Sequence, residues 1–127
     1  MRFYPMAMAG DIVITESPIN LDHQSLLDAL DLQGCGAVVS FLGITRGYDD
    51  GVKIHRLEFD AWQDKLGSVL HSLASEAIDK FGVKKIAMSH RTGKVNAGEN
   101  IVSIHVGSPH RKEAFAACEW LIDELKV

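Results

Sequence analysis

The chain has little of what builds secreted, membrane-spanning or metal-containing proteins. Its two cysteines, Cys35 and Cys118, stand far apart in the sequence, so neither a disulfide framework nor a cysteine-based zinc site is expected. Both have apolar neighbours, and we interpret them as reduced core residues of a cytoplasmic protein. No apolar run approaches the roughly 20 residues that span a bilayer, and residues 1–10 lack the pattern of a secretion signal. We therefore expect no membrane association.

Excess positive charge and nucleotide-binding motifs are missing as well. The chain holds 13 Lys and Arg against 17 Asp and Glu, for a net charge of −4, whereas a general nucleic-acid binder needs a basic surface. No phosphate-binding glycine loop, dinucleotide-binding glycine turn or serine-hydrolase elbow occurs. The histidines have no companion ligands at metal spacing, so no metal site is expected. A small local cationic site stays open.

What is present is typical of a globular domain. The 127 residues are 46% hydrophobic and 24% charged, which are ordinary values for a folded domain. The length matches one domain, and no repeat, linker or low-complexity tract divides it. We therefore expect a single domain over residues 1–127.

Hydrophobic periodicity predicts an α+β domain. The expected strands are 11–15, 37–44 (buried), 53–61, 83–90 and 101–106, the expected helices are 21–32, 62–81 and one that begins near 110, and the expected loops are 45–51 and 91–99. Asn20 is expected to cap the first helix and Gly82 to end the second. Strands and helices alternate too irregularly for a doubly wound sheet. The pattern favours a mixed or largely antiparallel sheet with helices packed on it.

The sequence Ser108-Pro109-His110-Arg111 is the first candidate site, because it stands where a strand gives way to a helix. The free N–H groups and the dipole of a helix N-terminus favour anions, and a His and an Arg there sharpen the preference for phosphate or carboxylate. An alternative stays open, in which Arg111 is a surface residue at a helix start and His110 is its cap.

Two further cations are candidates, each with an ordinary structural alternative. Arg46 follows a strand in a glycine-containing loop, from which it can bind an anion through two hydrogen bonds; alternatively it pairs with Asp49 or Asp50. Lys126 ends the last helix, where it can neutralise a developing oxyanion; alternatively it only stabilises the helix dipole.

The remaining polar residues are interpreted as structural. His90 follows an apolar run and is expected to be partly buried, and Arg91 is expected to pair with a carboxylate. Glu58 and Asp60 share one strand face but have no reacting group between them. The other histidines are interpreted as surface or core-edge residues: His23, His55, His71 and His105.

Three segments stand out when they are taken together. They are GAVVSFLGITR at 36–46, HRTG at 90–93 followed by Gly98-Glu99, and SPHRKEAF at 108–115 followed by DELK at 123–126. In this order and spacing they resemble the family of the large, catalytic subunit of molybdopterin synthase. The resemblance covers nearly all of residues 36–126.

The resemblance implies a fold, a reaction and partners. The fold is an α/β hammerhead, and two large subunits form a homodimer. Each binds a small ubiquitin-like sulfur carrier, giving a heterotetramer, and the carrier's Gly-Gly thiocarboxylate enters a pocket. Two sulfur transfers to cyclic pyranopterin monophosphate make the molybdopterin dithiolene. The subunit itself needs no cofactor or metal.

The resemblance also implies roles for four residues. Arg46, His110 and Arg111 match the anion site for the pterin phosphate or the carrier carboxyl, and Lys126 matches the first of two catalytic lysines. The family continues with a second lysine, whereas the printed sequence ends at Val127. A truncated enzyme and a noncatalytic relative that binds the carrier both stay open, as does a small-anion-binding regulatory domain.

Overall fold

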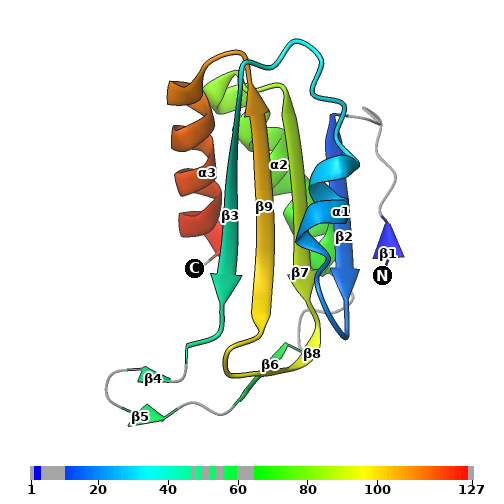
Figure 1. The fold of residues 1–127 in the computed structure, drawn as a ribbon, viewed down its shortest axis with the longest axis vertical. Coiled ribbons are helices and arrows are strands. Elements are labelled where there is room, and N and C mark those ends of the chain that lie inside the picture. Colours follow the sequence, from blue (N-terminus) through cyan, green and yellow to red (C-terminus); the bar gives the residue numbers. More distant parts are fainter. Residues whose placement is uncertain are drawn as a thin grey trace.

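The structure is a computed structural model. It describes residues 11–46 and 65–125 with their side chains, and the backbone alone of 2–3, 48–49, 52–53 and 56–59. The elements in chain order are β1 (Arg2–Phe3), β2 (Ile12–Ser17), α1 (His23–Asp28), β3 (Ala37–Ile44), β4 (Tyr48–Asp49), β5 (Val52–Lys53), β6 (Arg56–Phe59), α2 (Leu66–Phe81), β7 (Lys85–Arg91), β8 (Gly93–Asn96), β9 (Asn100–Ser108) and α3 (Arg111–Leu125) (Figure 1).

Five strands form one sheet in the order β1-β2-β7-β9-β3. The β2–β7 pair is parallel, and the other three pairs of this sheet are antiparallel. The short pairs β4–β5 and β6–β8 form two further ladders, which lie beyond one end of the sheet (Figure 1). The expected mixed sheet with helices packed on it is confirmed.

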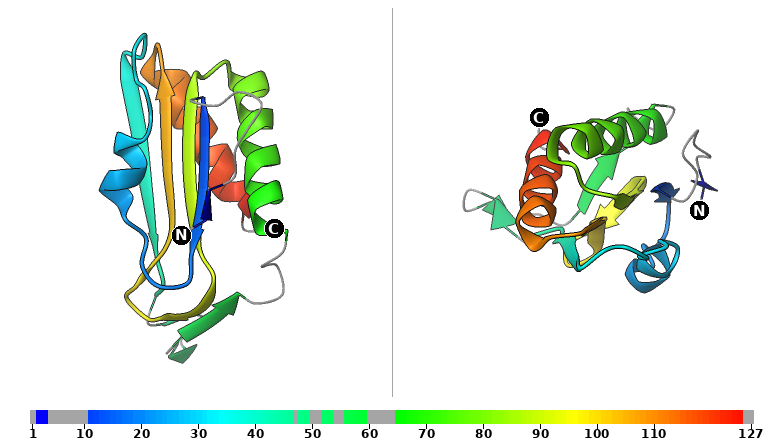
Figure 2. Two further views of the ribbon diagram at one scale, coloured as in Figure 1. Left: turned by 90° about the vertical axis from the view of Figure 1, so that its right-hand side faces the viewer. Right: turned by 90° about the horizontal axis from the view of Figure 1, so that it is seen from above.

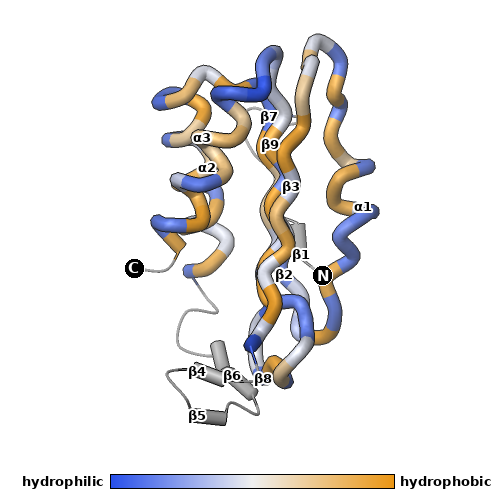
Figure 3. The backbone as a smooth tube through the Cα atoms, turned by 60° about the vertical axis from the view of Figure 1, so that its left-hand side comes forward, coloured by the Kyte–Doolittle hydropathy of each residue, from blue (hydrophilic) through white to orange (hydrophobic). Residues whose placement is uncertain are grey.

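The sheet separates two unequal helical layers. Helices α2 and α3 cover one face, and the short α1 lies on the other (Figure 2). The larger apolar core lies between the sheet and the helix pair, and hydrophobic residues recur along the strands, α2 and α3 (orange in Figure 3). Its fully buried members include Ile14, Leu70, Ile86, Ile104 and Leu121. Burying side chains of this size is the dominant stabilising contribution to such a fold.

Helix α2 follows directly from its sequence. Leu66, Leu70, Ala74 and Ala77 recur at helical spacing and are all buried against the sheet. Gly82 ends the helix in the left-handed conformation, with φ of 73°, which glycine adopts without steric cost. The expected end of this helix is therefore confirmed. Residues 62–64 of the expected start lie outside the described part.

The first helix is shorter than its apolar pattern predicts. It spans His23–Asp28, and its N-cap is Asp22 rather than Asn20. The Asp22 carboxylate accepts a hydrogen bond from the Ser25 N–H at 3.0 Å, which is the typical N-cap contact. Leu30 lies beyond the helix yet is buried in the small cluster below it. The apolar pattern therefore continues after α1 because Leu30 is buried, and not because the helix continues.

Strand β3 has the expected bounds but not the expected burial. It is an edge strand, paired with β9 alone within the main sheet. Val38 is 38% exposed and Ile44 is 55% exposed. The short helix α1 on this face of the sheet packs mainly on β7 and β9, so it does not cover these side chains of β3. A continuous apolar run is typical of a strand covered on both faces, and that prediction was wrong here.

Residues 91–99 also differ from the expected turn. Gly93–Asn96 form strand β8, which pairs with β6. The expected strand 53–61 is divided between β5 and β6 where its backbone is described. The side chains of Glu58 and Asp60 lie outside the described residues. Glycine and asparagine suggested a loop, but pairing with a distant segment overrides such local preferences.

A polar cluster joins α1 to the sheet. His105 is completely buried, so the interpretation of this residue as surface or core-edge was wrong. Its Nε2 lies 3.0 Å from the carbonyl oxygen of His23, and its Nδ1 lies 2.6 Å from the Ser40 hydroxyl. Because a carbonyl only accepts, Nε2 carries the proton and Nδ1 accepts from Ser40. The His23 ring packs on the His105 ring, with centroids 4.3 Å apart.

Two remaining expectations concern the cysteines and the membrane. Both cysteines are free thiols; Cys118 is buried in the main core and Cys35 is half-buried. Burial raises the pKa of the Cys118 thiol to about 11, which keeps it protonated and unreactive. In the part of the chain that the structure describes, no helix is long and apolar enough to cross a membrane.

The polar cluster makes the stability of the fold depend on pH. Burial and the nearby His23 ring lower the pKa of His105 to about 4, whereas an unfolded histidine titrates near 6.5. The unfolded chain therefore binds a proton at pH 5 that the folded chain excludes, and stability falls as the pH drops from about 6.5 towards 4. We expect His105 to remove about 2 kcal/mol from the free energy of unfolding between pH 7 and pH 5.

Urea unfolding at both pH values tests this expectation. The variant His105→Asn keeps a polar side chain but cannot titrate, so its loss between pH 7 and pH 5 is expected to be smaller than that of the wild type. His71→Asn, on α2 and outside the cluster, is the control and should behave as the wild type. Equal losses for His105→Asn and the wild type would contradict the role of His105.

Candidate functional site

The first candidate site lies at the junction of β9 and α3. The Ser108 carbonyl accepts a hydrogen bond from the Gly36 N–H at 3.0 Å, which fixes the end of the strand. His110 and Arg111 follow and are both exposed. They stand at the start of the 15-residue helix α3, whose free N–H groups favour an anion. The expected position of these two residues at the start of a helix is confirmed.

Ser108 belongs to the first candidate site, but the sequence predicted no role for its hydroxyl. Its Oγ is buried and has no hydrogen-bond partner among the described residues. A buried hydroxyl without a partner is costly. The hydroxyl is therefore a buried polar group without a partner among the described residues, close to the start of α3.

The junction is also tightly packed. A Cβ atom at Gly36 would lie 2.5 Å from the carbonyl oxygen of Pro109, closer than non-bonded atoms approach. Gly36 therefore allows β3 to come close to the segment that leads into α3. The position of His110 and Arg111 depends on this close approach.

The second candidate site lies at the other end of β3 and centres on Arg46. The Thr45 N–H donates to the Glu99 carbonyl at 3.0 Å, and the Thr45 carbonyl accepts from the Gly98 N–H at 2.7 Å. Thr45 is buried, and Arg46 directly after it is exposed. Two main-chain hydrogen bonds thus hold the backbone at Thr45, while Arg46, the next residue, is exposed.

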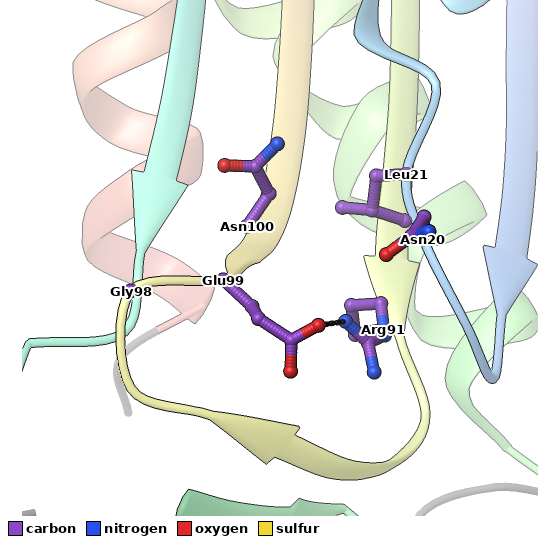
Figure 4. A pocket seen from close by; sticks show the side chains of 6 residues that line it. All are labelled: Asn20, Leu21, Arg91, Gly98, Glu99 and Asn100. Atoms are coloured by element: carbon purple, nitrogen blue, oxygen red, sulfur yellow. Dashed lines mark hydrogen bonds and ion pairs between the residues drawn. The ribbon is translucent and has the colours of Figure 1, made fainter.

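A cavity lies beside this anchor. It has a volume of about 250 Å³ and is lined by Asn20, Leu21, Arg91, Gly98, Glu99 and Asn100 (Figure 4). Arg91 is only 3% exposed and lies 3.4 Å from the Glu99 carboxylate. The expectation that Arg91 pairs with a carboxylate is confirmed. A hydrogen bond from the Asn96 N–H, with further help from Arg91, lowers the pKa of the Glu99 carboxyl.

His90 has the structural character that its sequence predicts. Its side chain is half-buried, and its Nδ1 donates to the carbonyl oxygen of Arg91 at 2.7 Å. Burial lowers the pKa of His90, so the ring is neutral at neutral pH. No group of three or more His, Cys, Asp or Glu side chains within residues 11–46 and 65–125 is arranged to hold a metal ion.

The two candidate sites do not meet within one chain. The register runs from Ala37 opposite Ser108 to Ile44 opposite Asn100, so Arg46 and the His110-Arg111 pair lie beyond opposite ends of the β3–β9 ladder. Eight residues of extended strand separate them by roughly 25 Å. The sequence-based expectation placed all three in one anion site, and a single phosphate cannot contact them all in one chain.

Lys126 lies outside the described residues. Helix α3, which ends at Leu125, runs back along the sheet from the Ser108 end, so its C-terminal end lies towards the end of the sheet at which β3 ends (Figure 1). A helix of this length covers roughly 22 Å, close to the length of β3. The direction of α3 therefore supports a grouping of its C-terminal end with Arg46 rather than with Arg111.

The family model described as "MoaE protein" matches residues 14–127 of this chain. Among curated proteins, the molybdopterin synthase catalytic subunit of Thermoplasma volcanium is 36% identical over 116 residues, which cover 91% of this chain and 82% of that protein. These matches confirm the resemblance seen in the three sequence segments.

Solved structures agree with the sequence comparisons. A MoaE protein of molybdopterin biosynthesis from Burkholderia ambifaria superposes with a TM-score of 0.76 at 25% identity, over 90% of this chain and 76% of that one. A protein–protein complex of subunits 1 and 2 of the molybdopterin-converting factor from Helicobacter pylori contains a chain with a TM-score of 0.65 at 28% identity, covering 91% of this chain and 77% of its own length.

The close packing at Gly36 gives a testable prediction. Gly36→Ala forces Pro109 to move and is expected to lower the free energy of unfolding by about 1–3 kcal/mol, as overpacking does. Gly34→Asn is the comparison without a steric clash, because nothing lies within 4 Å of a Cβ at Gly34; its φ of 86° strains any side chain, and asparagine bears that strain better than most residues. Unfolding in urea measures the free energy of unfolding of both variants. A wild-type value for Gly36→Ala would show that the contact with Pro109 is not restrictive.

Proposed function

Because the chain belongs to the MoaE protein family, we propose that it is the catalytic subunit of a molybdopterin synthase. Its reaction moves sulfur from the thiocarboxylated C-terminus of a small ubiquitin-like subunit to cyclic pyranopterin monophosphate. Two such transfers make the dithiolene of molybdopterin. The observation that carries the proposal is the family match over residues 14–127, which includes each of the cationic candidates. The free thiols of Cys35 and Cys118 support a cytoplasmic location.

The cations suit the two negative groups of this reaction. A phosphate monoester is bound best by two or more cationic donors; Arg46 and Arg111 supply them, and the His110 ring adds a further hydrogen-bonding group. Each sulfur transfer converts the carrier's thiocarboxylate into an ordinary carboxylate. The sulfur bonds to a pterin carbon, and water then attacks the carrier's acyl carbon and breaks the acyl C–S bond, which leaves the carboxylate. During this attack the acyl oxygen gains negative charge, which the ammonium group of Lys126 stabilises.

The partner is a small subunit whose C-terminal Gly-Gly tail enters a pocket of this chain. The Helicobacter pylori structure is a complex of subunits 1 and 2 of a molybdopterin-converting factor, and one chain in it resembles this one. Such a tail is extended and carries its charge at its end, so a cationic pocket at the end of the sheet suits it.

A second copy of the chain completes the anion site. Arg46 and the His110-Arg111 pair lie beyond opposite ends of one ladder, too far apart for one phosphate. Two copies related by a two-fold axis can pair opposite ends, so that Arg46 of one protomer meets Arg111 of its partner. The proposed homodimer therefore contains two anion sites, each made by both protomers.

Substitution of Lys126 tests the catalytic role directly. Lys126→Ala is expected to abolish dithiolene formation, a loss of at least about 100-fold, because a developing oxyanion loses its charge partner. Lys80→Ala is the matched control, since Lys80 occupies the last turn of α2 and has no proposed role. Product is measured after mixing with thiocarboxylated small subunit and substrate. Normal turnover by Lys126→Ala would contradict the role, and carrier binding without turnover by the wild-type chain would favour a noncatalytic protein.

Mixed dimers test whether the anion site is shared. Arg46→Ala and Arg111→Ala are each expected to be nearly inactive alone. When the two variants are co-refolded, half of the dimers are mixed, and each mixed dimer keeps one intact site. Activity is then expected to return to about a quarter of the wild-type value, by the arithmetic of an interface shared through two-fold symmetry. No recovery would show that each site lies within one chain.

A further inference from the structure

The backbone just before Arg46 is fixed by hydrogen bonds to a neighbouring turn. The two hydrogen bonds at Thr45 both go to the turn at residues 97–99, one to the Glu99 carbonyl and one from the Gly98 N–H. Arg46 is the next residue along the chain. The place of its Cα therefore depends on where this turn lies.

Glu99 holds the turn together. Its Oε1 accepts from the Asn96 N–H at 2.7 Å, and its own N–H donates to the Asn96 carbonyl at 3.1 Å. Its Oε2 faces the Arg91 guanidinium at 3.4 Å. The Glu99 side chain thus bridges the two ends of the turn and connects the turn to strand β7.

Arg91 connects the turn to the rest of the sheet. Its Nη2 donates to the Lys94 carbonyl at 2.9 Å and lies 3.4 Å from the Pro18 carbonyl, which follows β2. The residue is almost completely buried. A buried guanidinium requires a negative partner, and Glu99 is the carboxylate that it faces.

We propose that Arg91 and Glu99 are positioning residues, which hold the 97–99 turn so that Arg46 is presented to the substrate phosphate. The inference rests on the proposed function, because it assigns Arg46 to phosphate binding. Neither residue needs to touch the substrate. They act through the main chain of Thr45.

The cavity beside the pair makes this restraint necessary. About 250 Å³ of space lies between the turn and the segment at Asn20 and Leu21 (Figure 4). A turn released from Arg91 has room to shift into that space and carries Thr45 with it. A displacement of about 1 Å at a binding group costs much of its contribution.

The test separates substrate affinity from chemistry. Glu99→Ala is expected to raise the Kd for cyclic pyranopterin monophosphate about tenfold, the loss expected when one charge-assisted hydrogen bond is misplaced. Kd is measured by titration with the small subunit in its ordinary carboxylate form, so that no turnover occurs. The single-turnover rate at saturating substrate is expected to stay near the wild-type value. Glu99→Gln keeps one carbonyl oxygen to accept from the Asn96 N–H but turns a donor NH2 group towards Arg91, so it is expected to recover only part of the affinity.

A double-mutant cycle shows whether the effect passes through Arg46. In an Arg46→Ala background, Glu99→Ala is expected to cause no further loss of affinity, since the group that it positions is gone. Asp28→Asn is the control for the change of charge; its carboxylate is on α1, where it contacts Gln24. If Glu99→Ala does not fold, Arg91→Lys gives the same test, because it keeps the charge but loses the guanidinium contacts.

The outcomes distinguish the inference from the function on which it rests. If Arg46→Ala lowers affinity but Glu99→Ala does not, or if the two losses simply add, the positioning role is overturned and the phosphate site stands. If Arg46→Ala leaves affinity unchanged, the phosphate site itself is wrong, and the positioning role is overturned with it.

Discussion

The antiparallel pairing of β3 with β9 is the constraint on which the rest of the structure depends. Its register pairs Ala37 with Ser108 and Ile44 with Asn100, and just beyond these pairs the Gly36 N–H bonds the Ser108 carbonyl and the Thr45 N–H bonds the Glu99 carbonyl. The first contact places the start of α3, and the second places Arg46. A shift of one residue would move every side chain of β3 to the opposite face. Both candidate sites therefore follow from a single ladder.

The length of this ladder also separates the two sites and so shapes the proposed mechanism. Cations at opposite ends of one strand cannot both bind a single phosphate. Two protomers that pair opposite ends can supply both cations to one phosphate. The exposed apolar side chains Val38 and Ile44 lie on β3, the strand that has a free edge in the main sheet. In the proposed mechanism, a synthase built from this chain depends on assembly with a second copy for phosphate binding and on the small subunit for its sulfur.

Sequence reasoning succeeded where local chemistry decides structure and failed where distant pairing does. The bounds of β3 and the end of α2 at Gly82 follow from a β-branched run and from a glycine cap. The length of α1 did not, because buried leucines continue its pattern beyond the helix. Strand β8 was missed because its partner lies far away in sequence. His110 and Arg111 were grouped correctly, but their distance from Arg46 is a property of the topology, which no local pattern contains.

The most direct test of the sulfur-transfer function is a single-turnover reaction of the unaltered chain. The chain would be mixed with thiocarboxylated small subunit and cyclic pyranopterin monophosphate, and the dithiolene product and the remaining thiocarboxylate would be quantified together. We expect product to form with two thiocarboxylates consumed for each molecule. Stable binding of the small subunit with no loss of thiocarboxylate would contradict catalysis by this chain.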